Sequence, residues 1–265
     1  LNPVACFLNE QDDPRDPCAN PDTPEDVLDY RKFPIHEDPN TGSIAAVVTE
    51  GESWYTGLDL SWKWFGRKNW YSASYTLSKA EDLGPDPLKG GIYLPPDSAN
   101  LSAEKGRSDH DRRHRFVLAA ESPLPWWGMR VSGVLRVASG VPFNVTTGTD
   151  VNLDGIKSDR PPGIGRNTGA ETDLTVINAI RAEEGLDPVT QVEEPWLAQL
   201  DIRLTKPFAW SNRKGGGQFY VQIFNILDRE NYGLIEGRAT AANFGRPIGI
   251  AGPPRTVELG MQVEF

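Results

Sequence analysis

The sequence predicts an all-β fold, namely an antiparallel transmembrane β-barrel segment of about seven strands, with long extracellular loops and one short loop helix. Three observations lead to this expectation. Apolar and polar residues alternate strictly at the C-terminal end, the same alternation recurs six times upstream, and short and long connections alternate between these segments. A membrane-spanning β-strand needs about 9–11 residues with one apolar face, and these segments fit that requirement.

The clearest alternation lies in the last ten positions. One face consists of Val257, Leu259, Met261, Val263 and Phe265. The residues between them are polar or small: Thr256, Glu258, Gly260, Gln262 and Glu264. Successive side chains of an extended chain point to opposite faces, so one face is apolar and the other polar. A soluble sandwich strand can show the same alternation, but it seldom ends on a bare aromatic residue.

Six further segments repeat this pattern, and together with the last one they predict seven strands. They cover residues 58–64, 71–77, 116–121, 129–137, 198–205 and 217–223. In the fifth of them, Ala198, Leu200, Ile202 and Leu204 alternate with polar and charged residues, so all charges fall on one face. Barrel strands show this dyad repeat because one face meets lipid and the other meets the lumen.

The connections between the strands fall into two classes that alternate along the chain. The short ones are 66–69, 122–128 and 210–216, and the long ones, rich in Gly, Pro, Asp and Asn, are 78–112, 141–195 and 226–253. Periplasmic turns and extracellular loops of a barrel alternate in this way. An aromatic girdle is expected beside the short turns, from Trp64, Phe65, Trp70, Trp126, Trp127, Phe208 and Trp210.

Composition excludes two classes of protein. The chain has 265 residues, of which 38% are hydrophobic, and it contains no run of about 20 apolar residues, so a helical membrane protein is not expected. The formal net charge of −10 argues against nucleic acid as a partner, because phosphate binding needs a basic surface. Acidic external loops would favour divalent cations instead.

The N-terminal region differs from the rest. Residues 1–42 hold ten acidic residues, three Lys or Arg and seven prolines, which predicts an acidic, proline-rich extracellular loop, with the C-terminal part of the barrel in residues 43–265. Cys6 and Cys18 are the only cysteines, and their spacing suits a disulfide in an oxidising compartment. Free thiols or metal ligation are the alternatives.

Strand parity predicts that the chain is part of a larger barrel. Counting back from Phe265 on the periplasmic side, seven strands bring the N-terminal region out on the external side. Single-chain bacterial barrels have an even number of strands with both ends inside. No signal peptide is evident at Leu1, which suits a mature, processed or partial chain.

The long loops hold two further patterns. In 173–184, Leu174, Ile177 and Ile180 form one helical stripe, so a short packed helix is expected, with Thr172 as a possible cap and Gly185 just past its end. The charged run 109–115 opens a strand and is expected to form a charge network at the rim or in the lumen. The chain has no recognised catalytic motif, so no enzymatic activity is expected.

The longest loop contains a candidate calcium site. Oxygen-bearing residues recur at alternate positions around Gly155, where a sharp turn is expected. The candidate ligands are the side chains of Asp150, Asn152 and Asp154, the carbonyl of Ile156, and Asp159 directly or through water. An EF-hand would require glutamate at the position that Pro161 occupies, so any likeness is to looser Asp/Asn-rich loops. A polar turn without metal is the alternative.

The segments YTGLDLSWKWF, YSASYTLSKAED, SDHDRRHRFVLAAESPLP, VLRVASGVPFNVTTGTDVNLDGIKSDRPPGIGRN and FYVQIFNILDREN carry a family resemblance. In this order, over about residues 50–265, they resemble the C-terminal barrel strands of TonB-dependent outer-membrane receptors, and most closely the Oar-like branch with a carboxypeptidase-regulatory-like N-terminal domain. The final strand ending in Phe265 also resembles the signal by which the barrel-assembly machinery recognises its clients.

This resemblance implies a receptor in the bacterial outer membrane that binds an extracellular ligand and transports it. The partners that it implies are outer-membrane lipid, an N-terminal plug and barrel portion outside this sequence, and TonB, which would act through that portion. Two alternatives stay open. One is a surface-exposed, barrel-anchored binding or assembly component without transport, and the other is a soluble all-β module.

Overall fold

The computed structural model describes residues 51–84, 95–97, 100–151, 157–192, 195–210 and 215–264. The expectations for residues 1–42, including a bond between Cys6 and Cys18, therefore lie outside the described residues. So does the expected position of Phe265. Within the described ranges, no helix is long and apolar enough to cross a membrane.

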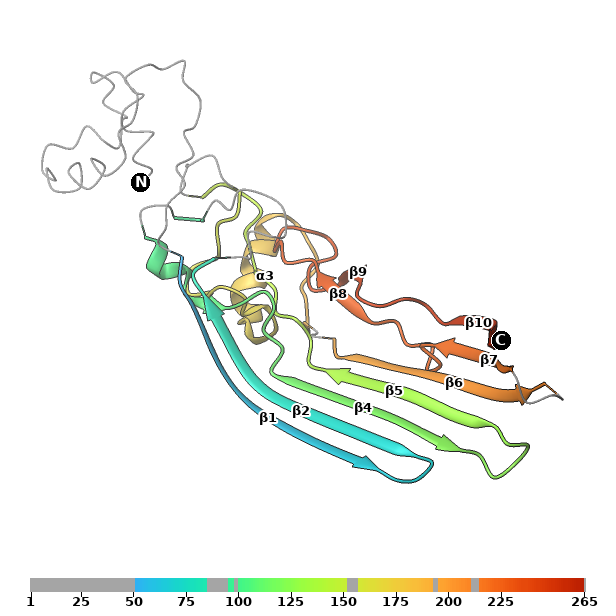
Figure 1. Ribbon diagram of the computed structural model, residues 1–265. Helices are drawn as coiled ribbons and strands as arrows, with labels where there is room; N and C mark the ends of the chain where they lie inside the picture. Colours follow the sequence, from blue (N-terminus) through green and yellow to red (C-terminus); the bar gives the residue numbers. More distant parts are fainter. Residues whose placement is uncertain are drawn as a thin grey trace, which may run out of the picture.

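Seven long strands form one antiparallel meander, which we call the wall (Figure 1). They are β1 (Ser53–Phe65), β2 (Trp70–Asp82), β4 (His114–Pro123), β5 (Arg130–Ala138), β6 (Leu197–Ala209), β7 (Gly216–Phe224) and β10 (Thr256–Glu264). The short β3 (Gly106–Arg107) adds to β2. All seven predicted strands are confirmed. The sheet is open, with β1 and β10 at its two ends.

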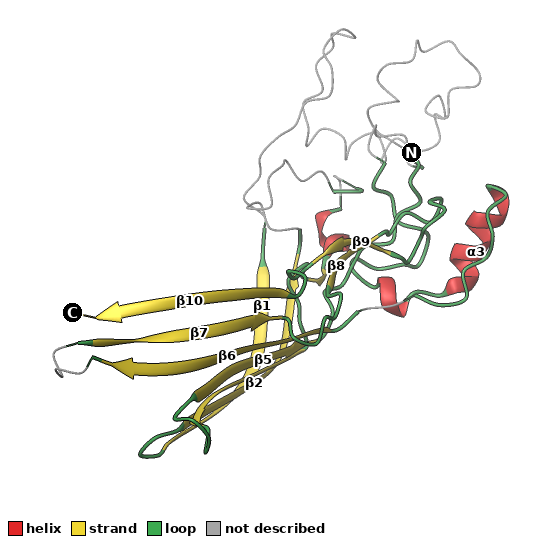
Figure 2. Cartoon of the chain, turned by 90° about the vertical axis from the view of Figure 1, so that its right-hand side faces the viewer, coloured by secondary structure: helices red, strands yellow, loops and turns green. Residues whose placement is uncertain are grey.

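The two classes of connection lie at opposite ends of the wall, as predicted. The short turns are closed by backbone hydrogen bonds, from Gly66 N–H to the Asn69 carbonyl at 2.8 Å and from Leu124 N–H to the Met129 carbonyl at 2.8 Å. Figure 2 shows the helices and long loops gathered at the other end of the strands. Each strand therefore runs the full distance between the two ends.

The long connections fold together into a unit that we call the cap, comprising the described parts of residues 95–113, 139–192 and 225–255. It contains η3 (Leu101–Glu104), η4 (Gly169–Glu171), α3 (Leu174–Glu183), β8 (Tyr232–Ile235) and β9 (Pro247–Ile250). The sheet of β8 and β9 was not expected from the sequence, because four-residue strands are too short to show a clear alternation.

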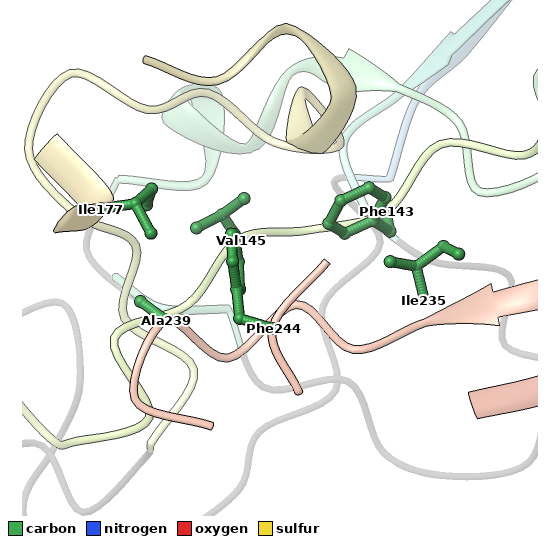
Figure 3. Close-up of a cluster of buried hydrophobic side chains, with 6 residues drawn as sticks. All are labelled: Phe143, Val145, Ile177, Ile235, Ala239 and Phe244. Carbon is green, nitrogen blue, oxygen red and sulfur yellow. The ribbon is translucent and has the colours of Figure 1, made fainter. Parts of the chain in front are cut away.

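A hydrophobic core lies inside the cap (Figure 3). It consists of Phe143, Val145, Ile177, Ile235, Ala239 and Phe244. Burial of each large side chain stabilises the cap by about 1.5–3 kcal/mol before entropic costs. Leu174 and Ile180 pack against this core and Ile177 is fully buried in it, which confirms the packing role predicted for the helical stripe.

The ends of α3 correct one prediction. Asp173, and not Thr172, caps the helix, since its carboxylate accepts a hydrogen bond from Thr175 N–H at 2.8 Å. The Thr172 hydroxyl instead donates to the Thr168 carbonyl at 2.9 Å, which ties it to the preceding turn η4. Gly185 has φ +67, so it ends the helix as predicted.

Candidate functional site

One face of the wall is apolar from β1 to β10, and it is exposed. Strand register places cross-strand partners on the same face, and it aligns Leu60 with Tyr75, Leu135 with Leu200, and Val221 with Leu259. Leu259 is 75% exposed and Leu60 56%. No described protein segment covers these side chains. An aliphatic surface of this extent suits contact with lipid.

The opposite face of the wall is polar, and its side chains interact across strands. Arg136 on β5 forms an ion pair with Asp201 on β6 at 3.0 Å. The side-chain amide of Gln218 on β7 donates to that of Gln262 on β10 at 2.8 Å. This division between the two faces is the one predicted from the alternation, and a barrel wall needs such a polar face to line its lumen.

The polar face also fixes β10 against its neighbours. The Tyr220 hydroxyl donates to Glu258 at 3.0 Å, and the Arg203 guanidinium lies 3.7 Å from the centre of the Tyr220 ring. The ring lies directly over Gly260, where any Cβ atom would overlap it. Glycine at this position therefore allows Tyr220 to lie flat between β6 and β10.

Aromatic side chains mark the short-turn end of the apolar face. Trp64 lies on that face and contacts Tyr71 at 5.6 Å between ring centroids, and Trp126 and Trp127 are exposed on the turn between β4 and β5. The predicted girdle is thus present. Register, however, pairs Phe65 with Trp70 on the polar face, because both residues are one position out of phase with Trp64.

A second aromatic band lies near the cap, and it was not predicted. The His114 ring lies between Tyr75 and Trp196, with centroid distances of 6.2 and 6.1 Å, and the Tyr75 hydroxyl is 2.8 Å from His114 Nδ1. On β1, Trp54 belongs to the same end, and the Lys105 ammonium lies 4.2 Å from its ring centroid. The sequence does carry a signal for this band, because Trp54 lies at the start of β1 and Trp196 lies just before β6.

The two bands have the spacing of a bilayer. Trp54 and Trp64 lie on the same face of β1, ten residues apart. At about 3.3 Å per residue they are about 33 Å apart along the strand. A tilt of about 40° reduces this to about 25 Å along the membrane normal, which is the usual height of the apolar band of a barrel.

Buried charged groups join the segments of the cap to one another. The Arg166 side chain, 1% exposed, forms an ion pair with Asp82 at the end of β2 and lies 3.5 Å from Asp109. Arg160 pairs with Glu104, which is also fully buried. A guanidinium can satisfy several oxygens at once, which suits burial among carboxylates. Arg166 thus joins the longest loop to the loop after β2.

Arg181 makes the second connection within the cap. Its guanidinium donates to the backbone carbonyls of Ala239 and Ala241 at 2.9 and 2.7 Å and to that of Asp187 at 2.8 Å. The helix α3 is thereby fixed to the loop between β8 and β9. Neither Arg166 nor Arg181 was singled out in the sequence, because an arginine in a loop shows no pattern that indicates burial.

The predicted rim network is also present. The Asp111 carboxylate, 2% exposed, accepts hydrogen bonds from Arg107 at 2.9 Å and from Ala80 N–H at 2.9 Å.

Elsewhere in the cap, hydrogen bonds from Arg238 lower the pKa of Glu236 below its ordinary value. Those bonds measure 2.9 Å from Arg238 Nε and 2.9 Å from its terminal nitrogen.

Of the candidate calcium ligands, Asp150 and Asp159 are described, whereas Asn152, Asp154 and Ile156 lie outside the described residues. The Asp159 carboxylate accepts from Val151 N–H at 2.6 Å, and its carbonyl accepts from Thr147 N–H at 2.8 Å. Asp159 thus closes the base of this loop. Among the residues that the structure describes, no three His, Cys, Asp or Glu side chains are grouped to hold a metal. The calcium site stays a prediction.

The apolar residues predicted as the assembly signal share one face of β10. Register places Val257, Leu259, Met261 and Val263 opposite Ile223, Val221, Phe219 and Gly217 of β7. This geometry follows the predicted strand phase. It does not test recognition by the assembly machinery.

Comparison with known families gives one match, to a family model described as "Outer membrane beta barrel domain", over residues 5–258. No curated protein and no solved structure matches the chain. The match covers nearly the whole chain and agrees with the meander, the two-faced wall and the spacing of the aromatic bands. The chain therefore belongs to the outer membrane beta barrel domain family.

Proposed function

We propose that this outer-membrane β-barrel protein is part of a TonB-dependent receptor that binds an extracellular ligand and takes it across the outer membrane. The observation that carries the proposal is the folded cap. Loops that served only as connections would need no common hydrophobic core and no buried ion pairs such as that of Arg166 with Asp82. A rigid cap presents fixed side chains to a ligand, which reduces the entropic cost of binding.

The polar face of the wall supports transport as the role. In a closed barrel this face lines the lumen, where a hydrated ligand or a plug would contact Gln218, Gln262 and the Arg203–Tyr220 pair. Movement of a ligand through such a lumen requires energy when a plug fills the lumen. The proposal assigns that energy to TonB, acting through a plug that the resemblance to these receptors implies.

The proposal also fixes the orientation in the membrane. The cap is extracellular, and the short turns, with the end of β10, face the periplasm. The apolar face of β10, on which Val257, Leu259 and Met261 are exposed and Val263 is half-buried, is then the surface that the barrel-assembly machinery recognises before insertion. Lipid covers this face afterwards.

Calcium binding at 150–159 is a separate part of the proposal. Asp159 already brings the two ends of this loop together through Val151 N–H. Asp150, Asp154 and Asp159 would then repel one another in a chain whose net charge is −10. A divalent cation would remove this repulsion, and Ca²⁺ suits a flexible loop of carboxylate and carbonyl oxygens better than Mg²⁺ does.

The test of the proposed function is binding of the purified periplasmic domain of TonB to outer membranes that contain the protein. Saturable binding that is lost in membranes from a deletion strain is the expected result. Absence of such binding would contradict TonB dependence. It would favour the alternative of a barrel-anchored binding or assembly component, for which the cap is equally suited and the barrel serves only as an anchor.

A further inference from the structure

An arginine without a carboxylate partner lies on the polar face of the wall, midway along β6. Among the residues that the structure describes, the Arg203 guanidinium forms no ion pair and no hydrogen bond with protein. Its Nε atom is buried without a partner, whereas its two terminal nitrogens are not buried. The open edge of this guanidinium is therefore the pair of terminal nitrogens, which can bind both oxygens of one oxyanion.

The carboxylates around Arg203 on this face are already bound by other groups. Strand register places Glu121 and Glu258 in the same cross-strand row as Arg203, and Asp201 lies two residues before it on β6. Their partners are Arg130 for Glu121, the Tyr220 hydroxyl for Glu258 and Arg136 for Asp201. Arg203 therefore holds a positive charge that no described side chain pairs.

Three strands hold the Arg203 guanidinium in place. It lies 3.7 Å from the centre of the Tyr220 ring on β7. The ring is fixed in turn by the bond from its hydroxyl to Glu258, and it covers Gly260 of β10, where no Cβ atom would fit. A stacked guanidinium has fewer conformations to lose than a free arginine side chain, so binding costs it less entropy.

Two uncharged side chains that can form hydrogen bonds flank Arg203 on the same face. Register places Ser132 of β5 opposite Arg203 on one side and Gln222 of β7 opposite it on the other. Such partners have Cβ atoms about 4.5–5.5 Å apart, so both side chains lie beside the guanidinium. Neither forms a side-chain hydrogen bond with a described residue. The row thus offers a charged fork between two unused hydrogen-bonding groups.

We infer that Arg203, with Ser132 and Gln222, is a binding site for a carboxylate on the lumen wall. The two terminal nitrogens at one edge match the two oxygens of a carboxylate. The single positive charge balances the single negative charge of that group, and the flanking side chains are neutral. The carboxylate comes from an Asp or Glu side chain of a protein segment inside the barrel or from a solute, and the experiments below separate these two sources.

The inference deepens the proposed function and rests on one part of it, namely that the polar face lines a lumen. It does not depend on TonB. Absence of TonB binding would leave the carboxylate site intact, and absence of a carboxylate at Arg203 would leave the test with TonB unaffected.

Zero-length crosslinking tests whether a protein carboxylate contacts position 203. The variant Arg203→Lys is treated in native outer membranes with a carbodiimide, which couples an amine to a carboxylate that touches it. Heat-modifiable gel mobility verifies folding. For a protein source, mass spectrometry should find position 203 joined to an Asp or Glu outside the wall, several-fold more often than Lys63, an exposed lysine of the same face. Coupling only to Glu121 or Glu258 would overturn the inference, because the wall would then satisfy its own arginine.

Arginine modification tests the site in the unchanged protein and includes carboxylates from solution. Washed membranes are treated with hydroxyphenylglyoxal, which attacks free guanidinium nitrogens, and the modified peptides are quantified by mass with chloride or with benzoate at equal ionic strength. The reference is Arg115, an exposed arginine of the same face. A protein carboxylate should protect Arg203 several-fold relative to Arg115 in both salts, whereas a solute site should be protected only in benzoate.

Two results of the modification experiment would overturn the inference. One is reaction of Arg203 as fast as that of Arg115 in both salts. The other is protection in chloride without any crosslink from position 203, because the arginine would then be covered by protein that offers no carboxylate.

Discussion

The wall and the cap place the same kinds of side chain in opposite positions. On the wall, Leu259 is 75% exposed, whereas in the cap Ile177 has no exposed surface. Charged groups are likewise reversed, since Arg136 on the polar face of the wall is 48% exposed and Arg166 in the cap is 1% exposed. Two different surroundings explain this difference. Lipid covers the apolar face of the wall, while the cap must build its own core in water.

The comparison also shows where each part gains its stability. The wall is held by its backbone ladder and by the bilayer, so a change on its outer face acts through insertion. The cap is held by packing and by buried ion pairs, so a change there acts through unpaired charge or cavity formation. Substitutions in the two regions should therefore produce effects that can be separated.

The largest effect is expected in the cap, for Arg166→Met. Removal of the guanidinium leaves the carboxylates of Asp82 and Asp109 without this partner, and loss of one side of a buried pair costs about 3–5 kcal/mol. Hydrogen exchange of cap amides, such as Asn167 N–H, measures the loss. The control is Arg255→Met, whose exposed pair with Asp228 should be worth about 1 kcal/mol or less. Equal exchange in the two variants would contradict the role of Arg166.

The next largest effect is expected on the wall, for Leu259→Arg. An arginine on the lipid face near the midplane costs about 2–4 kcal/mol. The control is Gln262→Arg on the polar face of the same strand, which should be tolerated, as should Glu258→Gln. The measurement is the fraction of protein assembled in membranes, from heat-modifiable mobility, together with the urea midpoint of unfolding. Equal losses on the two faces would show that the strand phase is wrong.

A more local effect is expected at 150–159 if this loop binds calcium. In the membrane-embedded protein the loop should resist limited proteolysis in Ca²⁺, become cleavable several-fold faster in chelator, and gain little protection from Mg²⁺. Asp154→Ala should be cleaved at the fast rate in both conditions. Cleavage sites are mapped by mass. Digestion that is indifferent to calcium would leave only the polar turn closed by Asp159.

The smallest effect concerns pH and the cap. Because Arg238 lowers the pKa of Glu236 from its ordinary 4.5 in the folded state, this pair stabilises the cap above about pH 4.5. The contribution is lost as the pH falls through the lower folded pKa, and it is small because solvent screens the exposed Arg238 side chain. Protection factors of cap amides, which are exchange rates corrected for the intrinsic pH dependence of amide exchange, should fall less between pH 6 and pH 3 for Glu236→Gln than for the unchanged protein. An identical pH dependence would contradict this assignment.

The wall could be predicted from the sequence because its signal is local. Each strand carries its own alternation, so Leu200 and Asp201 reveal their faces without knowledge of any distant residue. The cap could not be predicted, because its core joins Phe143, Ile177 and Ile235, which are far apart in the chain and belong to no common repeat. The same reason explains why Arg166 was missed. The helix α3 was found since its apolar stripe is also local.

The central claim is that the apolar face of the wall meets lipid and the polar face does not. Its most direct test is quenching by brominated lipids of a bimane fluorophore attached to single cysteines along β10, at positions 257, 258, 259, 261, 262 and 263, with Cys6 and Cys18 replaced by serine. Strong quenching is expected at 257, 259, 261 and 263, and weak quenching at 258 and 262. Quenching without this alternation, or strongest at 258 and 262, would contradict the claim.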